Sequence, residues 1–156
     1  MTNIRIETFE PLNEHHYEEL KKMLVAFSKE IYGYGQVNID QFLEAHWAVY
    51  LAVKGEEVVG FTSFMYNHYF GLKPPTVGNT YLYVKPEYRK SKASYLLTKQ
   101  AGHVSIFSEL PLETYYASDA SRNIGERVLN ATGSHMFDAH VYTLEQVREG
   151  YKYYTE

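Results

Sequence analysis

A short basic run, Arg89-Lys90-Ser91-Lys92-Ala93-Ser94, holds the residues of this chain best suited to binding an anion. It combines three cationic side chains and two hydroxyl groups within six residues. Arginine and lysine pair with phosphate oxygens, and serine hydroxyls add neutral hydrogen-bond donors. The run therefore predicts a site for a phosphate or diphosphate group.

The elements on both sides of this run are predicted to position it. Residues 80–84 form an apolar strand, and Pro86 ends it because proline has no N–H for a strand ladder. From Ala93 to Phe107 apolar residues recur at helical spacing. A helix start presents unpaired N–H groups and the positive end of a dipole, which favour an anion. The alternative is a solvated basic turn in an α/β domain.

The stretch V-x-P-E-Y-R at residues 84–89, followed by a helix, resembles the acyl-CoA-binding motif of the GNAT superfamily of N-acetyltransferases. In that family the loop reads Arg/Gln-x-x-Gly-x-Gly/Ala. Arg89 matches this pattern, whereas Lys92 and Ser94 replace the two glycines. Glycine lets the backbone approach a phosphate, and a left-handed conformation at Lys92 would cost ~1–2 kcal/mol.

The resemblance implies an α/β (α+β) fold in one domain, residues 1–156, with residues 146–156 as a tail or interface arm. The expected sheet is mixed, mostly antiparallel and of six to seven strands, with about four flanking helices and a V-shaped splay between the fourth and fifth strands. The residue pattern predicts the same order of elements: strand 4–9, a helix from Glu14, a short helix 41–47 capped by Asp40, hairpin strands 48–53 and 57–66, a strand 112–117, a helix that follows Asn123 and ends at Thr132-Gly133, and closing strands within 135–144.

Acetyl-CoA is the co-substrate that the resemblance implies. Its pyrophosphate is expected at Arg89, Lys90, Ser91, Lys92, Ala93 and Ser94. Its pantetheine arm is expected to pair with the backbone of Leu82, Tyr83 and Val84. Asn123 matches a family asparagine that contacts the CoA arm, and a helix cap is the alternative role for this residue.

Acetyl transfer needs a neutral amine, a polarised thioester carbonyl and a proton for the leaving thiolate. A lysine amine of pKa about 10.4 costs about 4.6 kcal/mol to deprotonate at pH 7. The resemblance implies a backbone N–H near Tyr83 or Val84 as the donor to the carbonyl. The usual tyrosine acid of the family is replaced by Leu129, and no glutamate base stands on the central strand. The candidate substitutes are Tyr81, His68 and Tyr116.

The composition excludes several other classes of protein. The 156-residue chain has no cysteine, so disulfides, thiol nucleophiles and thiolate metal sites are excluded. A net charge of −4 argues against direct nucleic-acid binding. The start of the chain is polar and shows neither a signal peptide nor a membrane span, which predicts a cytoplasmic protein. The histidines are scattered, and His15 and His16 are expected to be solvated, so no metal site is predicted.

The partner of such an enzyme would be an amine-bearing acceptor, either a protein or a small molecule, and the sequence does not choose between them. The chain has 16 tyrosines, a residue type that is common at interfaces, and a homodimer through the late strands or tail is one option. The missing glycines, acid and base leave a second reading open, a catalytically inactive GNAT-fold protein that binds or inhibits a partner. A third reading is an unrelated α/β binding domain.

Overall fold

The computed structural model of the protein describes residues 3–115, 119–129, 145 and 148–149. Its sheet has five strands in the order β1-β2-β3-β4-β5, of which the first four are antiparallel neighbours and β4 and β5 are parallel. The strands are β1 (Ile4–Thr8), β2 (Ala48–Lys54), β3 (Glu57–Asn67), β4 (Thr76–Val84) and β5 (Leu112–Thr114). The helices are α1 (Glu14–Tyr32), α2 (Ile39–Ala45), the 3₁₀ turn η1 (Pro86–Tyr88), α3 (Ala93–Ser108) and α4 (Asp119–Leu129).

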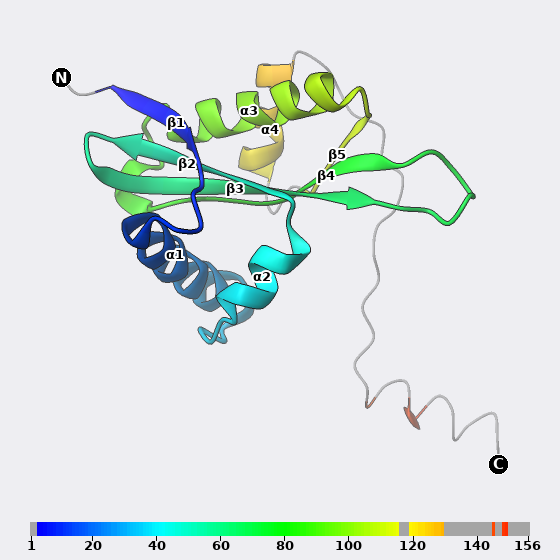
Figure 1. The fold of residues 1–156 in the computed structure, drawn as a ribbon, viewed down its shortest axis with the longest axis horizontal. Helices are drawn as coiled ribbons and strands as arrows, with labels where there is room; N and C mark the ends of the chain where they lie inside the picture. The colour runs from blue at the N-terminus through cyan, green and yellow to red at the C-terminus, as the bar shows by residue number, and fades with distance from the viewer. Residues whose placement is uncertain (1–2, 116–118, 130–144, 146–147, 150–156) are drawn as a thin grey trace.

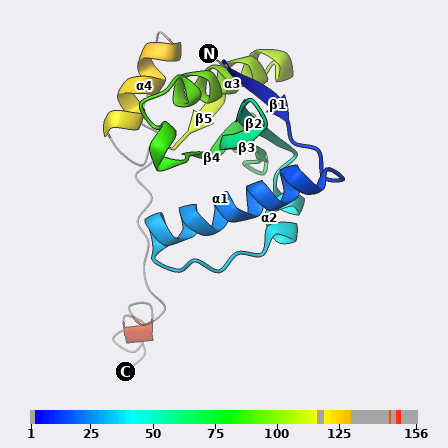
Figure 2. The ribbon, with the colours of Figure 1, turned by 90° about the vertical axis from the view of Figure 1, so that its left-hand side faces the viewer.

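The sheet lies between two layers of helices (Figures 1 and 2). One face is covered by α1 and α2, whose Leu20, Met23 and Phe42 pack with Leu51 and Phe61 of the sheet. The opposite face is covered by α3, whose Leu97 and Ala101 belong to two smaller apolar clusters. This two-faced core explains why the strands are apolar on both sides. No helix in the described part of the chain is long and apolar enough to cross a membrane.

The predicted fold class is confirmed, with a lower strand count. The sheet is mixed and mostly antiparallel, and four α-helices flank it among the described residues. Five strands are present in this part of the chain, where six to seven were expected. The predicted closing strands, residues 135–144, lie outside the described residues, as does most of the tail 146–156.

The boundaries of α1 follow from its capping residues. The side chain of Asn13 accepts a hydrogen bond from the backbone N–H of His16, at 3.1 Å. At the other end Gly33 takes φ +68° and donates its N–H to the carbonyl of Lys29, the left-handed cap that glycine adopts without strain. The prediction that Asp40 caps the next helix is wrong. Asn38 caps α2 instead, and the Asp40 carboxylate accepts the hydroxyl of Tyr17 at 3.0 Å.

The turn between β2 and β3 is the predicted one, with Gly55 at φ +63°. In β3 the register shifts so that Val59 is an extra residue next to Gly60. A Cβ atom at Gly60 would lie 2.7 Å from the backbone oxygen of Tyr83, so only glycine lets β3 approach β4 this closely.

The strand β4 is longer than predicted, and its pairing with β5 covers only part of it. It begins at Thr76, four residues before the expected start, because the loop after β3 is confined to residues 68–75. The strand β5 pairs with Val77, Gly78 and Asn79 of β4. From Thr80 to Val84 this edge of β4 has no strand partner in the described part of the chain. The predicted splay between the fourth and fifth strands is thus confirmed.

Candidate active site

A cleft of about 530 Å³ opens where β4 and β5 part. Its floor is the unpaired half of β4. Its walls come from the C-terminal half of α1, the start of α3, the end of β5 and the middle of α4. The lining residues are Phe27, Glu30, Ile31, Tyr32, Asn79, Thr80, Tyr81, Leu82, Tyr83, Val84, Arg89, Ser94, Thr98, Thr114, Tyr115, Ser121 and Ile124.

The backbone of β4 presents hydrogen-bonding groups to this cleft at alternate residues. The N–H of Lys85 donates to the carbonyl of Val59 on β3, at 2.9 Å. Because backbone groups alternate between the two edges of a strand, those of Tyr83 also face β3, and those of Leu82 and Val84 face the open edge. The carbonyl of Val84 accepts the Nε–H of Arg89 at 3.0 Å, which agrees with this orientation.

A β-bulge at Thr80 marks the point where the cleft begins. Tyr81 is opposite Ser63 and Asn79 is opposite Phe64, so Thr80 is the extra residue on β4. A bulge bends its strand and ends regular pairing. The bulge residue directly follows Asn79, the last residue of β4 that pairs with β5, and the bend thus contributes to the splay. The buried amide of Asn79 fixes this bend by donating to Thr62 Oγ1 at 2.7 Å and to the carbonyl of Ser63 at 3.1 Å.

The basic run folds as a tight turn into α3. Lys92 has φ −74°, a right-handed helical value, so the left-handed strain considered for this position does not arise. The hydroxyl of Ser91 donates to the carbonyl of Tyr88 and accepts the N–H of Ala93. Lys92, at the N-cap position, makes no side-chain cap bond, and no described residue accepts the backbone N–H of Ser94 or Tyr95. The start of α3 therefore keeps free donors beside Ser94, which lines the cleft.

Arg89 closes the cleft against α1. Its guanidinium nitrogen lies 2.6 Å from a carboxylate oxygen of Glu30, and its charged carbon lies 5.6 Å from the centre of the Tyr83 ring. The hydrogen bond with Glu30 raises the pKa of Arg89, so the guanidinium stays charged. Among the described lining residues there is therefore one cation and one carboxylate, and they already form a pair.

Solved structures share this fold. No family model matches the chain, and no curated protein matches its sequence. An aminoglycoside acetyltransferase, meta-AAC0020 from an uncultured soil metagenomic sample, matches with a TM-score of 0.71 and 12% identity over 90% of this chain and 96% of its own. The aminoglycoside N-acetyltransferase AAC(6')-Iy in complex with CoA matches with a TM-score of 0.67 and 13% identity over 91% and 96%. The ribosomal-protein-alanine N-acetyltransferase of Brucella melitensis biovar Abortus 2308 matches with a TM-score of 0.63 and 13% identity over 90% and 100%.

This chain has the GNAT fold. The expected order of strand, basic turn and helix is the β4–η1–α3 segment of that fold, and the match excludes an unrelated α/β fold. Matches at 12–13% identity establish the fold but do not identify a substrate.

Of the three predicted catalytic residues, one lines the cleft, one does not and one lies outside the described residues. Tyr81 lines the cleft, and burial and the nearby Tyr32 raise its pKa, so it is a protonated phenol at neutral pH. His68 is exposed in the loop after β3, its ring 6.4 Å from that of Tyr66, and it does not line the cleft. Tyr116 lies outside the described residues.

The predicted cofactor-binding residues are placed unevenly around the cleft. Leu82, Tyr83, Val84, Arg89 and Ser94 line it. Lys90, Ser91 and Lys92 are exposed and are not among the lining residues, and Ala93, the first residue of α3, is fully buried. Asn123 is exposed on α4 and is not among the lining residues, although Ser121 and Ile124 are. It lies inside α4, so its alternative role as a helix cap is wrong.

The sequence does not predict that α1 supplies a wall of the site. Phe27 belongs to the apolar stripe of α1, which predicted a core residue, yet its ring also lines the cleft. The rings of Tyr32, Tyr81 and Tyr83 surround it in edge-on contacts, with centroids 6.4, 5.2 and 6.1 Å away. An aromatic stripe at helical spacing is the signal that was available, but it does not distinguish core from cleft.

His46 is a second residue that the sequence pattern does not single out, and it lies next to Tyr81 of the cleft. Its Nδ1 is 2.7 Å from the carbonyl of Phe42, its ring stacks on Phe42 at 4.2 Å, and the ring of Tyr81 is 5.8 Å away. Burial lowers the pKa of His46, so the imidazole is neutral, and its Nε2 has no hydrogen-bond partner among the described residues.

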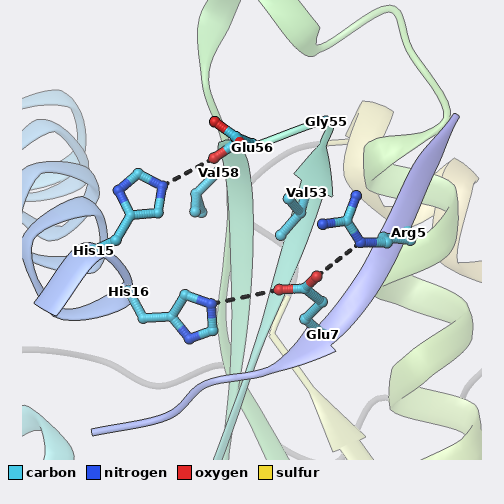
Figure 3. Close-up of a pocket in the computed structure, with 8 residues that line it drawn as sticks. All are labelled: Arg5, Glu7, His15, His16, Val53, Gly55, Glu56 and Val58. Atoms are coloured by element: carbon cyan, nitrogen blue, oxygen red, sulfur yellow. Dashed lines mark hydrogen bonds and ion pairs between the residues drawn. The ribbon is translucent and has the colours of Figure 1, made fainter. Parts of the chain in front are cut away.

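A smaller hollow of about 290 Å³ lies between β1, the start of α1 and the β2–β3 turn (Figure 3). Its charged groups are paired with one another. Arg5 Nε is 2.7 Å from Glu7 Oε1, His16 Nε2 is 3.4 Å from Glu7 Oε2, and His15 Nε2 is 2.9 Å from the carbonyl of Glu56. The expectation that both histidines are solvated is wrong for His16, which is 8% exposed because it ties α1 to β1. The two histidine contacts connect α1 to β1 and to the β2–β3 turn.

Proposed function

We propose that this chain is an acetyl-CoA-dependent N-acetyltransferase that moves an acetyl group to an amine. The observation that carries the proposal is the cleft at which the open edge of β4 meets the uncapped start of α3. Two structures of one GNAT-fold neighbour, AAC(6')-Iy, support it, because one is a complex with CoA and the other a complex with the bisubstrate analogue CoA-S-monomethyl-acetylneamine.

The residues present fit a diphosphate and an amide-bearing arm. The free N–H groups of Ser94 and Tyr95 and the dipole of α3 favour a phosphate oxygen at the helix start. Arg89 adds a charged donor inside the cleft, and the exposed Lys90 and Lys92 add positive charge in the turn between Arg89 and α3. Beyond this end the backbone groups of Leu82 and Val84 give a strand edge to which the two amides of a pantetheine arm can pair.

The chemistry required of the chain is then modest. The amine nitrogen attacks the thioester carbonyl carbon, a C–N bond forms, the C–S bond breaks, and CoA leaves as a thiol after gaining a proton. Backbone N–H groups on the open edge of β4 polarise the carbonyl. The protonated phenol of Tyr81 is the proton donor for the leaving thiolate that this site offers. No histidine is among the described lining residues, so we assign the removal of the amine proton to water.

Calorimetric titration tests the proposal. Acetyl-CoA should bind, and S-acetylpantetheine, which lacks the diphosphate and the nucleotide, should bind at least about tenfold more weakly because it loses the charged contacts at α3. Mass spectrometry of amines incubated with the protein and acetyl-CoA should then show a gain of one acetyl group. Failure of acetyl-CoA to bind would overturn the proposed function.

A further inference from the structure

We propose that the acceptor is a monoamine with an aromatic body, an arylalkylamine in chemical class, and that polycationic amines are poor acceptors. This inference rests on the proposed function, and it concerns the half of the cleft that faces α1. The names of the aminoglycoside acetyltransferases that share the fold indicate polycationic acceptors, since aminoglycosides carry several amino groups. The acceptor proposed here carries a single amine.

The charge of the cleft carries the first part of the argument. Among the described residues that line it, Glu30 is the only carboxylate and Arg89 the only cation. They lie 2.6 Å apart in the free protein, and if the diphosphate takes Arg89, Glu30 can pair with only one ammonium group. A polycation entering the cleft would lose water from several ammonium groups with at most one carboxylate to replace it, and burying an uncompensated charge is costly.

The aromatic wall carries the second part. Phe27, Tyr32 and Tyr81 present three rings from α1 and β4 to the same cleft, and Tyr115 stands at the end of β5. Tyr32 and Tyr115 are 66% and 65% exposed, so they keep ring area free for a ligand. Rings prefer edge-on or offset contacts with other rings, at about 0.5–1.5 kcal/mol for each pair beyond the area they bury. The wall therefore suits a flat apolar body.

The same wall prepares the amine for attack. An alkylammonium group is the wrong protonation state, and desolvation by apolar surroundings lowers its pKa. A monoamine requires the desolvation of one ammonium group, whereas a polycation must also desolvate amines that do not react. The rings can hold the remaining cationic fraction through cation–π contact until its proton is lost to water.

Release of free thiol gives a direct assay, because the chain contains no cysteine to react with a thiol reagent. Phenethylamine and tryptamine represent the proposed class, and kanamycin represents the polycations. We expect kcat/KM for at least one of the two arylalkylamines to exceed that for kanamycin by about tenfold or more. Binding of each amine without acetyl-CoA is measured in parallel by calorimetry.

Two tyrosines at one end of α1 provide a matched pair of variants. Tyr32 lines the cleft and is 66% exposed, whereas Tyr34 is 68% exposed and does not line it. Tyr32→Ala should raise KM for the arylalkylamine about threefold to tenfold, the loss of one ring pair, and leave acetyl-CoA affinity unchanged. Tyr34→Ala should leave both quantities unchanged.

The outcomes separate the two proposals. Higher kcat/KM or tighter binding for kanamycin than for both arylalkylamines overturns the acceptor class. Equal effects of Tyr32→Ala and Tyr34→Ala, or acetyl-CoA binding with no binding of either arylalkylamine, also overturn it. Tyr32-dependent binding of an arylalkylamine without any binding of acetyl-CoA overturns the proposed function and supports the amine site.

Discussion

The carboxylate of Glu30, near the end of α1, lies 2.6 Å from the guanidinium of Arg89, in the turn before α3. The two side chains are 43% and 42% exposed, so water and ligands reach both. The pair joins one wall of the cleft to the other. In the proposed enzyme the Glu30 carboxylate competes with the diphosphate of the ligand, because both pair with the same guanidinium.

Glu30→Gln should therefore increase the affinity for acetyl-CoA. Removing the carboxylate leaves Arg89 free for the diphosphate and removes a negative charge beside it. An exposed ion pair contributes about 0.2–1 kcal/mol, so we expect a gain of about twofold to fivefold, measured by calorimetry at low salt. The matched control is Glu18→Gln, an exposed glutamate on α1 that does not line the cleft. A loss of affinity in Glu30→Gln alone would show that the pair assists the ligand and does not compete with it.

Leu82→Pro tests the open edge of β4. Its N–H faces the cleft, so proline removes a donor that the β3–β4 ladder does not use. We expect acetyl-CoA affinity to fall by about threefold to tenfold, the net value of one hydrogen bond. Thermal unfolding of the variant shows whether the sheet is retained. A folded variant with undiminished affinity would contradict the assignment of the pantetheine arm to this edge.

Glu113 of β5 gives a pH-dependent contribution to stability. Burial raises its pKa, but hydrogen bonds from Tyr69 and Lys73 lower it more, to about 2 from the usual 4.5. The carboxylate also accepts the amide of Asn67 at 3.0 Å, so it fixes the loop after β3 to β5. Because the folded pKa is depressed, this stabilisation is present above about pH 4.5 and is lost as the pH falls toward 2.

Glu113→Gln should accordingly lower the free energy of unfolding by about 2 kcal/mol at pH 7, the scale of charged hydrogen bonds. The difference from the wild-type protein should shrink between pH 4.5 and 2, as denaturant titrations would measure. Glu56→Gln, at an exposed turn residue, is the control and should change little. A difference that stays constant over this range would contradict the role of the carboxylate charge.

The sequence predicts the parts of this fold that depend on local pattern. The stripe of α1 and the glycine that ends it define that helix within a residue, and Gly55 defines the β2–β3 turn. Local pattern is weaker where two residues can do the same work, as at Asn38 and Asp40, because both side chains can cap a helix.

The site itself depends on contacts between distant segments. The contacts of Phe27 with Tyr81 and Tyr83, the ion pair of Glu30 with Arg89 and the contact of His46 with Tyr81 all bring together residues that are far apart in the chain. No periodicity within one element reveals them. The strand, turn and helix of residues 80–107 could be predicted because each follows the last directly, and the placement of Ser94 in the cleft follows from that order.

The central claim, that the turn before α3 holds the diphosphate of an acyl-CoA, is tested most directly by calorimetry of acetyl-CoA with the wild-type protein and with Arg89→Glu/Lys92→Glu. Both side chains reach solvent, so the variant should fold, and Lys21→Glu/Lys99→Glu, at two exposed lysines away from the turn, reproduces the reversal of two positive charges. We predict saturable binding to the wild-type protein and to the control, and no measurable binding to Arg89→Glu/Lys92→Glu. Equal affinity in all three proteins, or no binding to the wild-type protein, would contradict the claim.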